Sequence, residues 1–150
     1  MEKEVFRQLH TWRRFTLKTL KLVDNAQVDK IPDGFNNNIR WNAGHILVIQ
    51  DRLTVQMLGL EPSYPEGYDR YFDKGTSPAE WDDAVPSMEE ITAELEGQLT
   101  KLESVISGRL SEEPAATVFN LPTIGDLAMF ASAHEAMHLN TIGILMRLSK

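Results

Sequence analysis

Two histidines, His134 and His138, lie four residues apart near the C-terminal end of the sequence. On an α-helix this spacing places both side chains on one face, with Cβ atoms about 5–6 Å apart, which suits two ligands of one metal ion. At about 100° per residue the same face carries Leu127 and Leu145, so both imidazoles are predicted to point inward. Buried imidazoles need polar partners that apolar neighbours do not offer, and a metal ion would satisfy both.

A third ligand is expected from another helix at similar depth. His45 is the natural candidate, because it lies on the inward stripe of a second helical segment between Trp41, Ile49 and Arg52. The alternative is a core histidine that donates to a carbonyl group. His10 is not expected to be a ligand, since three protein ligands suffice for a catalytic metal site.

The segment from His134 to His138 also matches the H-E-x-x-H pattern of zinc metalloproteases, in which the glutamate is the general base. That assignment is rejected because residues 139–150 contain no His, Asp or Glu to complete the site, and no strand is predicted to bind an extended substrate. Glu135 then has two interpretations: a flanking or surface residue, or a support for one of the histidines.

Length and composition are those of a globular protein. The chain has 150 residues, 42% hydrophobic and 25% charged, so we expect one domain over residues 1–150. The longest aliphatic run, Ile46–Ile49, is too short to span a membrane, and the charged start Met1–Glu4 does not resemble a secretory signal. A cytoplasmic location is expected. Because there is no cysteine, any metal must use His, Asp or Glu.

The net charge of −7 opposes non-specific binding to nucleic acids, which requires clustered Lys and Arg side chains. One basic cluster exists, formed by Arg13, Arg14, Lys18 and Lys21. It is interpreted as the solvated face of a helix. We expect neither a nucleic acid nor a membrane as partner.

Four segments have helical periodicity, and none has the alternation of a strand. They run from Val5 to Val23, from about Ile39 to Leu58 after an asparagine N-cap, from the capping box Ser87–Glu90 to Ile106, and from Thr123 to the C-terminus. Amphipathic helices of this length cover one another's apolar stripes, which predicts an all-α four-helix bundle.

The predicted connection from Gly59 to Pro86 is long for a helix bundle. It carries five aromatic residues, Tyr64, Tyr68, Tyr71, Phe72 and Trp81. The segment either covers one end of the core or forms a lid over a pocket, and the two roles are compatible.

Several segments together resemble the DinB / YfiT-like superfamily of bacterial four-helix proteins. They are Asn38–Leu47, Tyr71–Pro78, Thr123–Leu127 and His134–His138, and the resemblance covers nearly the whole chain. It implies a metal triad of His45, His134 and His138, a pocket that opens at the metal, and a homodimer. The chain departs from the family where Asn140-Thr141 replace a small residue and Gln, and Thr141 is predicted on the inward face.

Some members of this superfamily are S-transferases or isomerases that use bacillithiol or mycothiol. The leading hypothesis is therefore a metal-dependent transferase that joins a low-molecular-weight thiol to an electrophilic small molecule. A hydrolase with a metal-activated water, using Glu135 or Asp51 as the base, and a non-enzymatic metal or ligand binder are the alternatives. Zinc or nickel is favoured, with iron, cobalt or manganese possible. The predicted pocket residues are Trp41, Arg52, Tyr71 and Thr141.

Overall fold

The structure is a computed structural model that describes residues 1–150, and it is all-helical, as the sequence predicted. Four long helices form a bundle: α1 (Glu2–Leu20), α2 (Ile39–Arg52), α4 (Met88–Ile106) and α5 (Ile124–Leu148). Between α2 and α4 lie the short helix α3 (Tyr68–Phe72) and the 3₁₀ turns η1 (Gln56–Leu58) and η2 (Pro78–Glu80). None of these helices is long and apolar enough to cross a bilayer.

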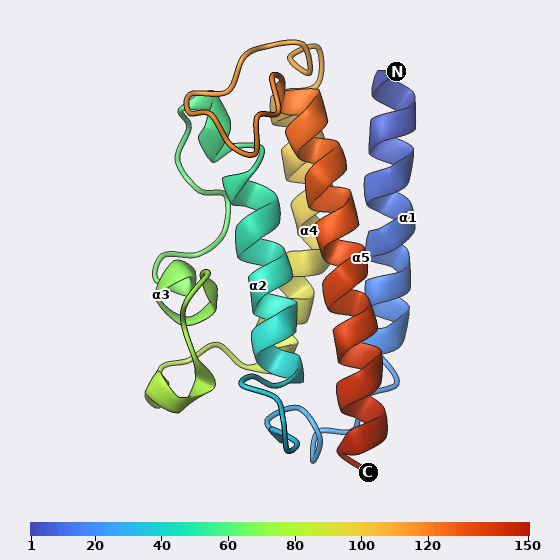
Figure 1. The fold of residues 1–150 in the computed structure, drawn as a ribbon, viewed down its shortest axis with the longest axis vertical. Helices are drawn as coiled ribbons and strands as arrows, with labels where there is room; N and C mark the ends of the chain where they lie inside the picture. The colour runs from blue at the N-terminus through green and yellow to red at the C-terminus, as the bar shows by residue number, and fades with distance from the viewer.

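The long helices do not simply alternate in direction (Figure 1). α1 and α5 run the same way, and the segment after α1 donates from Gln27 to the carbonyl of Met146 near the end of α5. α2 and α4 are also parallel, and Arg40 at the start of α2 donates to the carbonyl of Pro86, just before α4. The connection between α2 and α4 therefore runs back along the bundle, which accounts for its length.

The predicted starts of α2, α4 and α5 are confirmed by their caps, whereas α1 begins and ends three residues earlier than the predicted Val5–Val23. The Asn38 side chain accepts from the backbone N–H of Trp41, and the Thr123 side chain accepts from that of Asp126. Ser87 and Glu90 form a complete capping box at the start of α4. These caps satisfy N–H groups that the first turn of a helix leaves without partners.

The predicted end of the second helix is wrong. α2 ends at Arg52 and not at Leu58, and only the turn η1 continues the pattern. The Thr54 hydroxyl donates to the carbonyl of Gln50, where the backbone N–H of Thr54 would donate in a continuing helix. In addition, Thr54 and Val55 are both β-branched and favour a helix less than unbranched residues do.

The aromatic connection covers the core. Tyr64, Tyr68, Tyr71 and Phe72 are buried in the largest hydrophobic cluster, together with residues of α2 and α5. Phe72 lies flat against α2 at Gly44, where the Cβ of any other residue would overlap its ring. Glycine is therefore required at this position for the close approach.

An ion pair lies in the middle of the bundle. Arg13 is 3% exposed and Glu135 is 1% exposed. Arg13 Nε lies 2.9 Å from Glu135 Oε1 and Nη2 lies 3.2 Å from Oε2, and the Thr16 hydroxyl donates to the same carboxylate over 2.8 Å. The interpretations of Arg13 as a solvated residue and of Glu135 as a surface residue are therefore wrong. Arg13 follows Leu9 by four residues, which places it on the buried stripe of α1.

The same arginine links the remaining two helices. It donates from Nη1 to the carbonyl of Leu95 and from Nη2 to Gln98 Oε1, both on α4. Gln98 Nε2 then donates to the carbonyl of Leu47 on α2, over 2.7 Å. One buried polar network, formed by Arg13, Thr16, Gln98 and Glu135, thus joins all four long helices.

Replacing Arg13 with Met tests the network. The variant leaves Glu135 buried without its countercharge, which typically costs about 3–5 kcal/mol of the free energy of unfolding. Replacing both residues, in Arg13→Met/Glu135→Leu, removes the unpaired charge, so the double variant should be more stable than Arg13→Met. Urea unfolding followed by circular dichroism measures both. A double variant that is less stable than the single one would contradict this account.

Candidate metal centre

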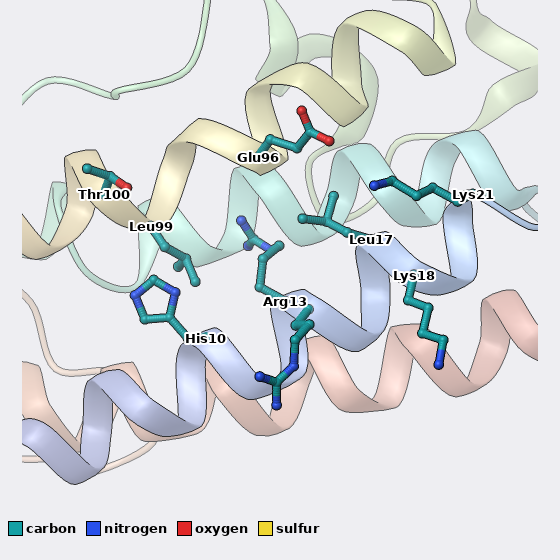
Figure 2. Close-up of a pocket in the computed structure, with 9 residues that line it drawn as sticks. His10, Arg13, Leu17, Lys18, Lys21, Glu96, Leu99 and Thr100 are labelled. Carbon is teal, nitrogen blue, oxygen red and sulfur yellow. The ribbon is translucent and has the colours of Figure 1, made fainter.

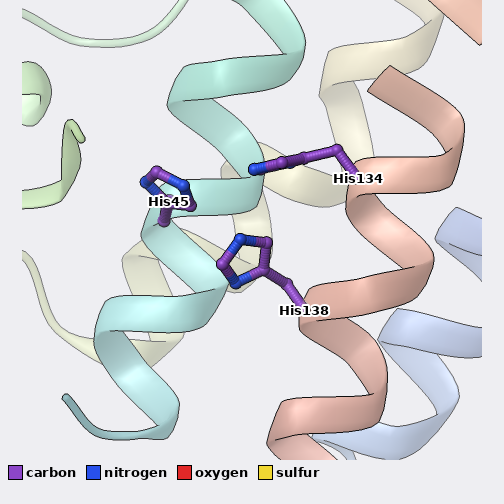
Figure 3. Close-up of side chains that lie close together, drawn as sticks. All are labelled: His45, His134 and His138. Carbon is purple, nitrogen blue, oxygen red and sulfur yellow. The ribbon is translucent and has the colours of Figure 1, made fainter. Parts of the chain in front are cut away.

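The three histidines singled out from the sequence come together between α2 and α5. His45, His134 and His138 each contribute one ring nitrogen to a group in which all three atoms lie within 4.8 Å of one another. The three side chains point toward one another, His45 from α2 and the other two from α5 (Figure 3). Their ring centroids are 4.4–5.1 Å apart. His45 is buried, and the other two are partly buried.

The side chain of His45 is fixed on two sides. Its Nδ1 lies 2.7 Å from the carbonyl oxygen of Phe72, which can only accept, so Nδ1 carries the proton. The indole of Trp41 stacks on the imidazole at 4.4 Å, with an angle of 15° between the planes. The remaining nitrogen, Nε2, therefore keeps its lone pair. Since Phe72 reaches this position only beside Gly44, the glycine contributes indirectly to the site.

Asn42 holds His138 in the same tautomer. The Asn42 amide nitrogen donates to the carbonyl of Asn38 and to the side chain of Asn37, which orients the amide. Its oxygen therefore faces His138 Nδ1, 2.8 Å away, and accepts a proton from it. The Nε2 of His138 is again left free as a ligand atom. A hydrogen bond of this kind to the far nitrogen usually supports a metal-binding histidine.

All three imidazoles are neutral at physiological pH. Burial, followed by the charge of His45, lowers the pKa of His134 to about 4. Burial and the charges of His134 and His45 lower the pKa of His138 to about 3. Burial also lowers the pKa of His45, although its bond to Phe72 opposes that effect. Neutral imidazoles offer the lone pairs that a metal ion requires.

The two carboxylates predicted as bases are bound elsewhere. Both oxygens of Glu135 are used in the network with Arg13 and Thr16. Asp51 is buried and accepts from the backbone and the hydroxyl of Ser63, and burial raises its pKa. The structure brings neither carboxylate into the group of histidines.

Of the predicted pocket residues, two lie close to His45. Trp41 stacks on it, as described above. Arg52 follows His45 by seven residues, which is two helical turns on the same face, and forms an ion pair with Asp73. Asp73 directly follows Phe72, whose carbonyl binds His45, so this ion pair lies at the edge of the site.

The other two pocket residues make bonds of their own. The Tyr71 hydroxyl donates to Asp82, and Tyr71 is buried in the core cluster. The Thr141 hydroxyl donates to the carbonyl of Met137 within α5. Neither side chain forms a hydrogen bond with the three histidines.

Two supporting groups, Asn42 and the carbonyl of Phe72, were not predicted from the sequence. Asn42 precedes His45 by three residues and so lies on nearly the same face of α2, and this spacing was an available signal. The Phe72 carbonyl has no signal in the sequence, because it depends on the backbone of the connection folding against α2.

The donor set fits a divalent metal. Three neutral imidazoles, two of them with a fixed tautomer, can hold a metal ion and leave a position open for a further ligand. Zinc, nickel and other first-row divalent ions all accept such nitrogen ligands. The structure thus defines the class: an all-α bundle with a three-histidine group able to bind a metal.

The chain belongs to the DinB superfamily, whose sequence profile matches residues 8–142. This confirms the resemblance found in the sequence. The fold is similar to the crystal structure of a conserved protein from Enterococcus faecalis, with a TM-score of 0.72 and 14% sequence identity. The similarity covers 99% of this chain and 96% of the other. No curated protein matches the sequence.

Removing the Asn42 side chain should weaken metal binding while His45 and His134 remain in place. In Asn42→Leu the His138 ring loses the group that fixes its tautomer, and losses of such partners typically reduce metal affinity by about 10–100-fold. Competition titration with a zinc indicator measures the affinity. An Asn36→Leu variant, altered at an exposed asparagine, is the control and should bind like wild type. Unchanged affinity in Asn42→Leu would contradict the assigned hydrogen bond.

The lowered pKa values of His134 and His138 predict how stability depends on pH. An unfolded histidine has a pKa near 6.5, so between about pH 6.5 and 4 the unfolded chain binds more protons than the folded one. The metal-free protein should therefore lose stability as the pH falls through this range. In His138→Gln the loss should be shallower, as measured by urea unfolding at several pH values. Parallel curves for the two proteins would show that His138 is not held neutral.

Proposed function

We propose that this protein is a divalent-metal-dependent transferase that joins a low-molecular-weight thiol, of the bacillithiol type, to an electrophilic small molecule. The observation that carries the proposal is the group of three neutral imidazoles with no carboxylate among them. Neutral ligands leave the full positive charge on a bound ion. That environment favours an anionic sulfur as the next ligand.

The nucleophile must come from a cosubstrate, because the chain has no cysteine. A metal bound by the three histidines would supply the charge that lowers the pKa of an incoming thiol. The thiol gives its proton to solvent, and the sulfur forms the new bond to the electrophilic carbon. The leaving group departs with the electron pair of the bond that breaks.

Other residues of the site hold the imidazoles in position, exclude water from one side and offer a group that can bind the cosubstrate. The Phe72 carbonyl and Asn42 hold two imidazoles in the tautomer that leaves the lone pair of Nε2 free for a metal ion. Trp41, stacked on His45, shields that side of the site from water. Arg52 is partly exposed and pairs with one carboxylate, that of Asp73. The other N–H groups of the Arg52 guanidinium can therefore bind an anionic group of the thiol cosubstrate.

The same geometry makes a hydrolase less suitable. A metal-activated water profits from a nearby carboxylate that accepts its proton. Glu135 and Asp51 are both engaged in bonds of their own. Hydrolysis and simple metal binding are therefore the competing outcomes of the experiment below.

The metal, the assembly state and the location form part of the same proposal. We expect zinc or nickel, with iron, cobalt or manganese as alternatives that the nitrogen ligands also accept. The homodimer implied by the family has a candidate surface in the exposed apolar residues Met129, Phe130 and Met137 of α5 and in Phe119. A cytoplasmic location suits the use of a reduced thiol.

A thiol-consumption assay tests the transferase. Metal-loaded protein is incubated with a small thiol and a panel of electrophiles, and the loss of thiol and the mass of the product are measured. Wild type should consume thiol only when metal is present. His45→Ala should bind metal more weakly and should stay inactive when excess metal restores occupancy, because two ligands change the charge and geometry around the ion. His10→Ala should retain the metal content of wild type, since His10 pairs with Glu103 away from the site.

Three results would reject the transferase. Turnover of an electrophile without thiol would indicate the hydrolase. Metal binding without any turnover would indicate a binding protein. Full thiol transfer in His45→Ala would separate the activity from the three histidines.

A further inference from the structure

A second candidate site lies on the other side of the bundle, in a groove between α1 and α4. The groove encloses a cavity of about 370 Å³, within the range of small-molecule sites. Arg13 and Leu17 reach from α1 toward α4, with His10 at one end and Lys21 at the other, whereas Lys18 points from α1 to the side away from α4 (Figure 2). None of these residues belongs to the group of three histidines.

The groove concentrates positive charge in an acidic protein. Residues 5–23 contain five of the 15 Lys and Arg residues and no Asp or Glu. The rest of the chain carries all 22 acidic residues. Only one carboxylate, Glu96, lines the groove.

Three of the cations in the groove have no ion-pair or hydrogen-bond partner within the protein, although the Arg14 guanidinium lies over the Phe15 ring. Arg14, Lys18 and Lys21 form neither an ion pair nor a side-chain hydrogen bond, although Arg7 and Arg40 elsewhere pair with carboxylates. Their spacing of four and three residues sets like charges beside one another on α1, which is unfavourable. The helix dipole compensates for Lys18 and Lys21 near the C-terminal end of α1, but not for Arg14 in its middle.

The floor of the groove is also polar. Arg13 is 3% exposed and lines the cavity. Its guanidinium has five N–H groups, of which four donate to Glu135, Leu95 and Gln98. One N–H on Nη1 is left. A buried N–H group normally meets a polar group, and Arg13 lines the cavity, so a polar ligand bound there can accept a hydrogen bond from it.

We propose that this groove binds a small organic phosphate. Three cations without ion pairs and the side chain of Thr100 line a cavity that fits a small molecule, and the buried Arg13 side chain lines it as well. Glu96, on the opposite wall, can accept a hydrogen bond from a hydroxyl group of the same ligand. A long polyanion such as duplex DNA fits less well, because it would extend over the acidic remainder of the surface.

Titration of ¹⁵N-labelled protein with inorganic pyrophosphate and with glucose 6-phosphate tests the site. Both probes should shift the amide signals around Arg14, Lys18 and Thr100, and the shifts should saturate. Lys18→Gln/Lys21→Gln should weaken binding about tenfold or more, as expected for the loss of two charged donors. The matched control is Lys3→Gln/Lys150→Gln, which changes the net charge equally at exposed positions outside the groove and should bind like wild type.

His138→Ala separates this site from the metal centre. It should bind both phosphates like wild type, because the groove does not use the histidines between α2 and α5. Loss of binding in His138→Ala would place the anion at the metal and overturn the proposal. Shifts that do not saturate, equal weakening in both double variants, or tighter binding of a 20-base-pair DNA duplex through the same lysines would also overturn it.

Discussion

The buried ion pair between Arg13 and Glu135 constrains the whole bundle. A charge removed from water is tolerated only when its countercharge and all its hydrogen-bond partners are present. α1 and α5 can therefore pack in only one alignment along the bundle axis. Arg13 extends the same requirement to α4, and Gln98 extends it to the Leu47 carbonyl of α2. Glu135 directly follows His134, so the network that fixes the position of α5 also fixes that of a histidine in the candidate metal centre.

The connection between α2 and α4 fixes another histidine of the site, His45 on α2. Because these helices are parallel, the connection must return along the bundle, and its aromatic residues pack against α2 on the way. At Gly44 the missing side chain lets the Phe72 ring lie close to the helix, and the carbonyl of Phe72 then reaches His45. A segment that covers the core thereby also fixes the tautomer of a candidate ligand.

The two candidate sites differ in their electrostatics and lie on opposite sides of the bundle. Between α2 and α5, burial keeps three imidazoles neutral, so positive charge there would come from an ion. Between α1 and α4 the charge belongs to the protein itself, on the exposed side chains of Arg14, Lys18 and Lys21. The first arrangement suits a soft or borderline nucleophile, and the second suits a hydrated anion.

The sequence by itself determined what depends on local geometry: the capped starts of the helices, the all-α class, and the shared face of His134 and His138. These follow from hydrogen bonds and periodicities that span a few residues. That His45 lies beside the other two histidines also followed from the sequence, because an inward stripe restricts where a third histidine can point. The burial of Arg13 and the role of Asn42 were decided only by the tertiary structure. Asn42 forms a hydrogen bond with a histidine 96 positions away, and Arg13 with a glutamate 122 positions away. A charged residue beside the apolar face of a helix enters the core only when folding brings a polar partner to it, and otherwise stays in water.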